Sequence, residues 1–385
     1  MTHIVMLISN PFRPDSRALK EAESLRSVGY AVTILCWDRE AAYPPEETLA
    51  SGVQIIRIRD VPSTYAIGSR QVLRLFKFWF ATFPILKRLQ PGLLHCHDFD
   101  TLPAGLFWGR LHHLPVIYDA REYYADLVKP RLHGFSGRVL YHSIRFAERL
   151  GTRLASGVIT VDEKLGAIYR KLNKNVLVIG HYPALKSFQE AVPVFTRAEL
   201  NLIYVGRASI DRGLLIYAEL LRFLRQAGIP ARLILAGSIT PSSEEDTFWR
   251  SVQGLEEYVD WMGWIEYDRV PKLLQSADVG LSVWTPEPRY VAAVPVKLFE
   301  YMAVGLPVVA SNFPEIRKIV QEANCGALVD PEKSPALIAE IIKEWWADPQ
   351  IPRALGQNGY QVARQKYFWE NISGQIVEMY RVLIH

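Results

Sequence analysis

Two arginines in the second half of the chain are placed to bind an anionic ligand. The stretch YVGRASIDRGL (204–214) puts Arg207 directly after an apolar run and Arg212 five residues later, with Gly206 and Gly213 beside them. Guanidinium groups offer planar forks of donors to anionic oxygens, and glycine allows a close backbone approach. The pair therefore suits a diphosphate. A solvated basic turn is the alternative that this stretch alone leaves open.

Glu300 is a third candidate, and it interrupts an otherwise apolar pattern. The segment PVKLFEYMAVGLPVVAS (295–311) predicts a helix over about 295–304, which Gly305 and Pro307 end, and then a buried strand. A carboxylate in the second turn can accept hydrogen bonds from neighbouring hydroxyls, and first-turn amides suit phosphate oxygens. A solvated surface carboxylate is the plain alternative.

Loops that follow apolar runs in the first half carry further candidates. LLHCHDFD ends with His97 and Asp98, and histidine can donate or accept a proton near neutral pH. A buried structural histidine is the alternative. Arg17, in PDSR, can reach a phosphate from the first strand-to-helix loop, and Glu122, in VIYDAREYY, suits either an acceptor or a structural ion pair. The D-x-D form of residues 98–100 is too weak a signal for a metal site, so we expect no metal.

The composition restricts the class of protein. The chain has 385 residues, of which 49% are hydrophobic and 22% charged, and this length fits two globular domains. The net charge of +4 is small, so it does not call for nucleic acid. The widely spaced Cys36, Cys96 and Cys325 are expected to be reduced core residues of a cytosolic protein. No leader-like segment is expected, and the aromatic run 78–86 is too short to span a bilayer.

Strand-like and helix-like runs alternate twice along the chain, which predicts two doubly wound parallel sheets. The first-half strands are expected at 3–9, 31–37, 93–97, 116–119, 157–161 and 176–179, with helices at 16–29, 101–113 and about 137–155. The second-half strands are expected at 201–206, 232–237, 258–263, 279–284, 308–311 and 326–330, with a helix at about 213–227. The expected fold class is α/β.

The expected domain organisation follows from this alternation. Two Rossmann-like domains, 1–185 and 200–366, are joined by a linker at 186–199, where Pro193 and the lack of a clear period break the pattern. A C-terminal helix at 367–385 is expected to return to the first domain. A ligand is expected in the crevice between the domains, at the carboxyl ends of the strands.

The motifs together resemble the family 4 glycosyltransferases, which have the GT-B fold. The resemblance rests on GRASIDRG, PVKLFEYMAVGLPVVAS, HCHDFDTLP and VIYDAREYY, and it extends over nearly the whole chain. It implies that Arg207 and Arg212 hold the diphosphate of a nucleotide-sugar donor. It implies that Glu300 accepts from the ribose hydroxyls and that His97 serves the transferred sugar and the reacting groups. The implied reaction moves the sugar to an acceptor hydroxyl with retention, without metal or cofactor.

Other residues are assigned roles in the same reaction. Asp98 and Glu122 are assigned to the acceptor, and Arg17 to the donor. Backbone groups near Gly237 and Trp264 are expected to hold the nucleobase, with Trp264 either stacking or packing. The remaining residues assigned to donor binding are Gly206, Lys297 and Leu298, and surface charge is the alternative for Lys297.

The chain departs from the family pattern at several positions. Ala292 stands where a first motif glutamate normally contacts the transferred sugar, which puts that contact in doubt; Glu287 is a nearby substitute. Arg212 replaces a more frequent lysine, and Arg121 replaces the histidine of the usual D-A-H-E. Ala292 is also the main support for two alternatives, a nucleotide-sugar epimerase and a non-catalytic binding protein.

The acceptor is the least readable part of the expected reaction. A saccharide, a lipid-linked glycan and a small molecule all remain open, as do UDP and GDP donors. Segment 70–88 is basic and aromatic, which suits either peripheral contact with an anionic membrane or a core helix with Phe76, Phe80 and Phe83 inward. We expect a cytoplasmic enzyme of surface polysaccharide or glycoconjugate biosynthesis, peripheral to the membrane if this helix binds it.

Overall fold

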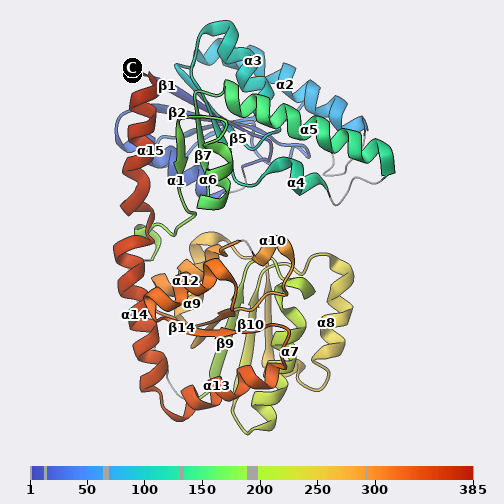
Figure 1. Ribbon diagram of the computed structural model, residues 1–385, viewed down its shortest axis with the longest axis vertical. Helices are drawn as coiled ribbons and strands as arrows, with labels where there is room; N and C mark the ends of the chain where they lie inside the picture. The colour runs from blue at the N-terminus through green and yellow to red at the C-terminus, as the bar shows by residue number, and fades with distance from the viewer. Residues whose placement is uncertain are drawn as a thin grey trace. The chain divides into compact units, whose positions relative to one another are not determined.

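The computed structural model describes residues 2–12, 15–63, 69–129, 134–188, 198–291 and 293–384, apart from the side chains of 69–71. The chain divides into two compact units (Figure 1). Unit 1 comprises Met1–His181 and Ile372–His385, and unit 2 comprises Tyr182–Asn371. Tyr182 belongs to unit 2 because its ring packs against Phe299 and Tyr367. Most of the expected linker, 189–197, lies outside the described residues.

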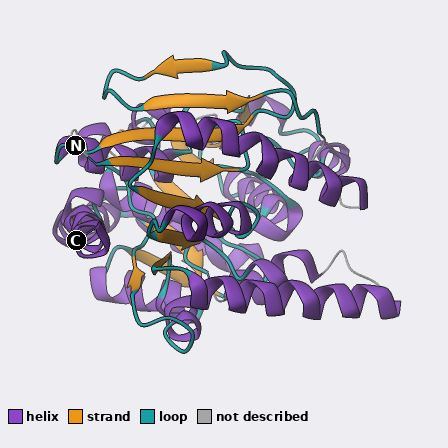
Figure 2. Cartoon of the chain, turned by 90° about the horizontal axis from the view of Figure 1, so that it is seen from above, coloured by secondary structure: helices purple, strands orange, loops and turns teal. Residues whose placement is uncertain are grey.

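The described part of unit 1 is built on an eight-stranded sheet in the order β3-β4-β2-β1-β5-β6-β7-β8. Its strands are β1 His3–Ile8, β2 Ala31–Trp37, β3 Glu46–Thr48, β4 Gln54–Ile58, β5 Leu93–His97, β6 Val116–Ala120, β7 Gly157–Thr160 and β8 Val176–Val178. All pair in parallel except the edge strand β3, which runs antiparallel to β4, as Figure 2 shows. The expected strands are confirmed, and β3 and β4 are additional to them.

Helices cover both faces of this sheet. They are α1 Ser16–Ser27, α2 Ser69–Leu89, α3 Leu102–His112, α4 Tyr124–Val128, α5 Gly134–Leu154 and α6 Glu163–Tyr169. Acidic side chains begin two of them: Asp15 accepts from the Ala18 amide, and Asp162 accepts from the Leu165 amide. These caps fix the residues at which α1 and α6 begin, after the carboxyl ends of β1 and β7.

Helix α2 does not have the orientation of the core-helix alternative for 70–88. Phe78 is fully buried and stacks on Trp37 with ring centroids 4.8 Å apart. Phe76 and Phe80 are exposed, and Phe83 is half-buried. The alternative with Phe76 and Phe80 inward is therefore wrong, because the Trp37–Phe78 stack sets the rotation of the helix.

Unit 2 is built on a six-stranded parallel sheet in the order β11-β10-β9-β12-β13-β14 over its described residues. The strands are β9 Leu200–Val205, β10 Ala231–Ala236, β11 Val259–Gly263, β12 Val279–Ser282, β13 Val308–Ser311 and β14 Gly326–Val329. The helices are α7 Leu214–Gln226, α8 Glu245–Ser251, α9 Val270–Gln275, α10 Pro288–Val291, α11 Val296–Ala303, α12 Pro314–Ala323, α13 Pro335–Ala347 and α14 Gln350–Lys366. The expected α/β class with two Rossmann-like sheets is confirmed.

The last helix, α15 (Trp369–Ile384), belongs to both units. At its start the Trp369 amide donates to the Pro183 carbonyl of unit 2 at 2.8 Å. Near its end Tyr380 is fully buried in unit 1 and bonds to His95. The expected return of the C-terminal helix to the first domain is confirmed.

Two expectations about chemistry and membranes can be compared with the structure. All three cysteines are free and buried, as expected. Among the described helices, none combines the length and the hydropathy that a bilayer-spanning segment needs.

The seam between β12 and helix α11 gives a test of the packing. A Cβ at Gly280 would lie 2.5 Å from the Tyr301 ring, whereas one at Gly374 would meet nothing within 4 Å. We expect Gly280→Ala to destabilise the protein by about 1–3 kcal/mol through overpacking. Gly374→Ala, the control in α15, should stabilise it by about 0.5–1 kcal/mol. Urea denaturation measures both; an unchanged midpoint for Gly280→Ala would contradict the packing.

Candidate functional site

Two glycine loops meet at the carboxyl ends of β9 and β10 in unit 2. A Cβ at Gly237 would lie 2.0 Å from the Gly206 carbonyl oxygen, so a side chain at Gly237 is excluded by the neighbouring loop. At Gly206, with φ 107°, a Cβ would instead enter open space bordered by the Nζ of Lys297 at 3.8 Å. The structure therefore provides an approach to the backbone at Gly206 that only glycine leaves free.

Helix α11 is fixed to this edge of the sheet by Tyr301. The Tyr301 hydroxyl accepts from the Val205 amide at 3.3 Å and lies 3.2 Å from the Leu281 carbonyl oxygen, to which it donates. The ring is fully buried between β9 and β12. Because Tyr301 is next to Glu300 in sequence, these bonds also fix where Glu300 leaves the helix.

Lys297 and Glu300 project from the first turns of α11. Lys297 is 7% exposed and Glu300 5% exposed, so both are nearly enclosed. Glu300 lies beside Tyr267, and burial together with this carboxylate raises the pKa of the Tyr267 hydroxyl. The predicted helix is confirmed within a residue at each end, although Pro295 takes the N-cap position rather than the first helical turn.

Lys297 is the most unusual cation of the site. Its Nζ lies 3.3 Å from the centroid of the Tyr204 ring, and no hydrogen-bond partner for it occurs among the described residues. Burial, and then the nearby Arg212 guanidinium, hold its pKa well below the usual value. A buried ammonium without an acceptor is costly, so an anionic ligand at this position would be strongly stabilised.

The two loop arginines have different surroundings. Arg207 is exposed directly after Gly206. Arg212 is partly buried: its Nε donates to the Tyr290 hydroxyl at 3.2 Å, and its guanidinium lies over the Trp284 ring. Burial alone would lower the pKa of Arg212, but the Tyr290 hydroxyl raises it overall, so the group stays charged.

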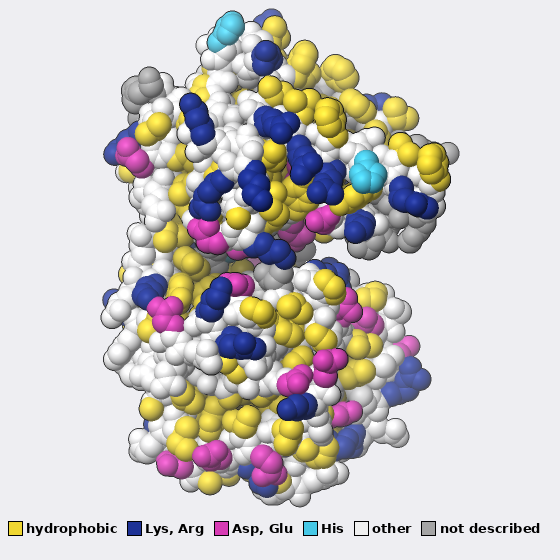
Figure 3. All heavy atoms as spheres, in the orientation of Figure 1, with side chains coloured by type: hydrophobic (Ala, Val, Ile, Leu, Met, Phe, Trp, Pro, Cys, Tyr) yellow, Lys and Arg dark blue, Asp and Glu magenta, His cyan; other side chains and the backbone are white. Residues whose placement is uncertain are grey.

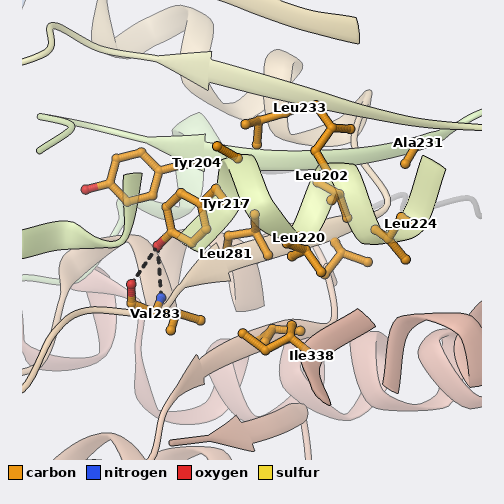
Figure 4. Close-up of a cluster of buried hydrophobic side chains, with 14 of the residues drawn as sticks. Leu202, Tyr204, Tyr217, Leu220, Leu224, Ala231, Leu233, Leu281, Val283 and Ile338 are labelled. Carbon is orange, nitrogen blue, oxygen red and sulfur yellow. Dashed lines mark hydrogen bonds between the residues drawn. The ribbon is translucent and has the colours of Figure 1, made fainter. Parts of the chain in front are cut away.

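A tyrosine of α7 fixes the loop that carries Arg212. The Tyr217 hydroxyl donates to the Val283 carbonyl at 3.1 Å and accepts from the Val283 amide at 3.0 Å (Figure 4). Gly213, with φ 88°, lies so close that a Cβ there would be 2.0 Å from the Val283 carbonyl oxygen. The start of α7 is thereby fixed against the end of β12.

Other predicted residues of unit 2 lie in less suitable places. The Leu298 side chain is fully buried in the core, and its amide donates to the Pro295 carbonyl, so its assignment to donor binding is not supported. Trp264 is half exposed just after β11, and Glu287 is exposed before α10. Ala292 lies outside the described residues.

Unit 1 places its candidates in a buried polar cluster at the carboxyl ends of β5 and β6. His97 and Asp119 are register partners, and the His97 Nδ1–H donates to Asp119 Oδ2 at 3.0 Å. Burial opposes the charge of Asp119, but Arg17 and the bond from His97 hold its pKa well below the usual range. His97 is 1% exposed in this state.

Arg17 lies inside this cluster rather than at the surface. It is 1% exposed, its Nη2 contacts Asp119 Oδ1 at 3.2 Å, and its Nε contacts Glu21 Oε1 at 3.1 Å. Its Nη1 donates to the Ile179 carbonyl. The expected reach of Arg17 to a donor phosphate is therefore corrected: its donors are directed at groups of unit 1, where it neutralises two buried carboxylates.

Behind this pair lie Glu21 and His95. The His95 ring stacks on His97 with centroids 4.1 Å apart, and its Nδ1 bonds to the Tyr380 hydroxyl at 2.5 Å. Burial, and then repulsion from Asp119, raise the pKa of Glu21 to about 7. Burial and the neighbouring His97 hold the pKa of His95 well below its usual value, so this imidazole is neutral.

Four of these groups have the chemistry of metal ligands. Glu21, His95, His97 and Asp119 bring one potential ligand atom each within 4.8 Å of one another. Guanidinium and imidazole groups already occupy the oxygens of Asp119. The D-x-D residues 98–100 are not part of this group.

Arg121 and Asp15 border His97. Arg121 Nη1 contacts Asp15 Oδ2 at 2.5 Å, and its Nη2 is 3.2 Å from His97 Nδ1. Arg121 holds the pKa of Asp15 at about 2, although burial opposes this, and burial raises the pKa of Asp98 to about 7. Glu122, by contrast, is exposed. Arg121, which replaces the histidine of the family pattern, thus borders the polar cluster and forms an ion pair with Asp15.

Several residues that build the site are absent from the sequence predictions. Tyr301 is indistinguishable from an ordinary core residue of an apolar helix, and Glu21 and His95 resemble surface residues of α1 and β5. The i, i+4 spacing of Arg17 and Glu21 is a usable signal for their ion pair. Nothing local in the sequence indicates that Tyr380 reaches His95, 285 residues away.

Comparison with known proteins agrees with this architecture. Residues 170–362 match the family described as glycosyl transferases group 1, and residues 14–179 match the glycosyl transferase 4-like domain. An uncharacterized glycosyltransferase of Methanocaldococcus jannaschii is 24% identical over 94% of this chain and 92% of its own length. A GDP-mannose-dependent alpha-(1-6)-phosphatidylinositol dimannoside mannosyltransferase of Mycobacterium tuberculosis is 27% identical over 70% of this chain and 69% of its own.

Solved structures show the same fold. Sucrose-phosphate synthase from Thermosynechococcus elongatus superposes with a TM-score of 0.78 at 20% identity, over 100% of this chain and 99% of that one. Anabaena HepE, solved with UDP and glucose, gives 0.68 at 17% identity, over 99% and 100%. Both are neighbours in fold. Two Rossmann-like units of this kind define the GT-B class, and the chain belongs to the group 1 glycosyl transferases.

The buried cluster of unit 1 predicts a pH effect on stability. Glu21 has a pKa of about 7 when folded against 4.5 for the free side chain, so the folded state binds its proton more tightly. Its contribution to stability is complete below pH 4.5 and is lost as the pH rises through 7. Glu21→Gln removes this dependence. The unfolding free energy of the wild type minus that of the variant should fall by about 2 kcal/mol between pH 5 and pH 8.

Urea denaturation of both proteins across this pH range checks the effect. Glu163→Gln, an exposed position at the start of α6, is the control for replacing a carboxylate in unit 1. A difference between wild type and Glu21→Gln that stays constant with pH would show that Glu21 is ionised in the folded state throughout.

Proposed function

We propose that this protein transfers a sugar, as a hexosyltransferase, from a nucleoside diphosphate sugar to an acceptor hydroxyl with retention of the anomeric configuration. The observation that carries the proposal is the set of cations around the Gly206 backbone. Lys297 is enclosed and has no hydrogen-bond acceptor among the described residues, and Arg207 and Arg212 lie on the adjoining loop. A diphosphate would supply anionic oxygens to these three cations.

The chemistry assigned to unit 2 is stabilisation of the leaving group. As the bond between the sugar C1 and the β-phosphate oxygen breaks, negative charge grows on the nucleoside diphosphate. Lys297, Arg207 and Arg212 oppose that charge, and enclosure of Lys297 strengthens its effect. Binding of the anion raises the lowered pKa of Lys297, so that the amine takes up or keeps a proton.

Glu300 is assigned to the ribose. Its carboxylate lies in the second turn of the helix whose first turn carries Lys297, so one rigid element contacts both the sugar and the phosphates of a nucleotide. The new bond forms between C1 and the acceptor oxygen on the face that the diphosphate leaves. The acceptor proton passes to a phosphate oxygen of the leaving group.

Unit 1 is assigned to the acceptor and the transferred sugar, through His97, Asp98 and Glu122. Within this proposal Asp119 holds the His97 ring by its Nδ1, and Nε2 lies 3.9 Å from the buried Glu21 carboxyl group. Because His97 is nearly fully buried, contact with a substrate requires Arg121 and Asp15 to move away from it.

The reaction is proposed to need no metal ion or cofactor. Three cationic side chains of unit 2 are sufficient for the charge of a diphosphate, and the carboxylates of the unit 1 cluster are neutralised by Arg17 and Arg121. EDTA should therefore leave activity unchanged. Loss of activity with EDTA, restored by a divalent ion, would remove this part of the proposal.

The biological role proposed is synthesis of a surface polysaccharide or glycoconjugate in the cytoplasm. Support comes from relatives: one is named an O-antigen chain mannosyltransferase of Escherichia coli, and another acts on a phosphatidylinositol dimannoside. UDP and GDP are both candidate donors, because one structural neighbour was solved with UDP and one relative is named for GDP-mannose. Peripheral contact with the membrane through 70–88 is part of the proposal.

A second candidate function is a non-catalytic or epimerase-like protein, which Ala292 favours because the usual contact with the transferred sugar is missing. The two are distinguished by incubating the protein with UDP- and GDP-sugars and acceptor mixtures. Transfer releases nucleoside diphosphate in proportion to glycosylated product. Epimerisation changes the sugar of the nucleotide without such a product, and a binding protein gives neither.

Glu300→Gln tests the donor site directly. We expect the affinity for the preferred nucleoside diphosphate to fall about 10- to 100-fold, because a hydrogen bond to a charged group contributes about 1.5–3 kcal/mol. Lys297→Met should weaken binding to a similar degree. Glu219→Gln, on an exposed position of α7, is the control and should bind as the wild type does.

Isothermal titration calorimetry with UDP, GDP, ADP and CMP measures these affinities. If Glu300→Gln binds the nucleotide as tightly as the wild type does, the ribose contact must be assigned to another residue. Equal binding by Lys297→Met would do the same for the phosphate contact.

A further inference from the structure

Exposed apolar side chains are concentrated on three helices of unit 1. Of the 18 large hydrophobic residues that are exposed among the described residues, twelve lie on α2, α3 and α5. Phe135 is 80% exposed and Phe146 is 69% exposed, both on α5. The others on these helices are Val72, Leu73, Phe76, Phe80, Phe107, Leu111, Val139, Leu140, Leu150 and Leu154. Scattered single residues of this kind are normal, but a group on neighbouring helices marks an interaction surface.

The exposed apolar residues of α5 lie on the side of the helix that faces away from the core of unit 1. Its buried side is lined by Gly137, Glu148, Gly151 and Thr152. Glu148 accepts from the hydroxyls of Tyr118 and Tyr169 and from two amides at the start of α4. The inward side of α5 is therefore small and polar, while the phenylalanines and leucines lie on the opposite side.

The three helices form one surface. Phe83 of α2 packs against Phe107 of α3 with ring centroids 5.4 Å apart. On the other side, a Cβ at Gly151 of α5 would lie 2.8 Å from the side chain of Leu102 in α3. Helix α3 thus lies between α2 and α5 and contacts both. We call the outer side of α2, α3 and α5 the helical face.

The charge of the helical face is of one sign. Helices α2, α3 and α5 contain ten lysines and arginines and a single acidic residue, Glu148, which is buried. The whole chain has a net charge of only +4, so the remainder of the chain is net negative. The exposed cations of the face are Lys77, Lys87, Arg88, Arg110, Arg138, Arg149 and Arg153. Figure 3 shows dark blue and yellow side chains next to one another over unit 1.

We propose that the helical face binds the surface of an anionic lipid bilayer, with α5 as its main contact. The proposal rests on the proposed function, because it makes the acceptor of the transferase one that is presented at a membrane. Exposed phenylalanines and leucines insert at the boundary between headgroups and acyl chains, and the arginines between them pair with lipid phosphates. The sequence predicts membrane contact through 70–88, and the structure extends the surface to α3 and α5.

Charge complementarity selects this occupant over two others. A symmetric dimer through the helical face would bring arginines of one copy against arginines of the other, with no exposed acid on these helices to pair them. An acidic protein would pair with the arginines, but it would leave without a partner the apolar residues that extend over three helices. A bilayer supplies apolar depth and negative charge over any area.

Vesicle co-sedimentation tests the proposal with the full-length protein. The probes are vesicles of phosphatidylcholine alone and vesicles with a third of phosphatidylglycerol. We expect binding to the anionic vesicles, weakened by salt, and little binding to the neutral ones. Arg149→Ala with Arg153→Ala should lower partitioning about fivefold for each arginine, since each contributes about 1 kcal/mol near an anionic surface. Phe135→Ser with Phe146→Ser should lower it at least tenfold.

Matched controls on unit 2 keep the test specific. Leu337→Ser on α13 and Arg353→Ala on α14 remove an exposed apolar and an exposed basic residue away from the helical face and should partition as the wild type does. Thermal melting of each variant confirms that it folds. Equal binding to both vesicle types, binding that the α5 variants do not weaken, or no binding would overturn the proposal. So would concentration-dependent dimerisation that the α5 variants abolish, because it would identify a second copy as the occupant.

Failure of this inference is separable from failure of the proposed function. Vesicle binding is measured without nucleotide, and nucleoside diphosphate binding is measured without lipid. Donor binding without vesicle binding sinks only the membrane contact, and vesicle binding without donor binding sinks only the transferase assignment. With both intact, the α5 variants should lose activity on a lipid-linked acceptor but retain their affinity for the donor nucleotide.

Discussion

The attachment of Tyr301 to the ends of β9 and β12 is the constraint on which the proposed donor site depends. Its hydroxyl bonds to backbone groups of two adjacent strands, and its ring fills the space that Gly280 leaves open. Helix α11 cannot shift or rotate without breaking these contacts. Lys297 and Glu300, one turn and one residue before it, are therefore held at fixed positions, with Lys297 beside Gly206. Precise placement of few charges requires this kind of rigid support.

Unit 1, in contrast, buries several ionisable groups in one place. Asp119, Glu21 and Asp15 are balanced by Arg17 and Arg121, and two imidazoles fill the remaining positions. Such a cluster is expensive to desolvate and is stable only while its partners are complete. Tyr380 completes it from α15, so the last helix of the chain supports the ring stack of His95 and His97. The helix thereby connects the C-terminus to the polar centre of unit 1.

Much of the fold could be predicted from local sequence, and the site only in part. Buried parallel strands read as apolar runs, which is why β1, β2 and β5 were located within a residue. The short edge strand β3 and its neighbour β4 have no such run with clear boundaries. Arg207, Lys297 and Glu300 follow from motif spacing. The sequence predicts that Arg17 reaches a donor phosphate. Its actual partner, Asp119, is 102 positions away, and no local pattern indicates such a pairing.

The rotation of α2 illustrates the same limit. Its sequence offers aromatic residues on more than one side, and the choice of Phe78 depends on Trp37 from β2. Long-range partners also decided the roles of Glu21, His95 and Tyr380. The signals that sequence does carry are spacing within one helix or one loop, and the predicted donor-binding segments rest on these.

Amide hydrogen exchange with and without a nucleoside diphosphate tests the central claim, that α11 and the loop after β9 form the donor site. With saturating UDP or GDP, whichever binds, the account predicts slower exchange at 206–212 and 296–300, and unchanged exchange in α13 at 335–347. Slower exchange in α13, or elsewhere in unit 2 without any change in the two predicted segments, would contradict it.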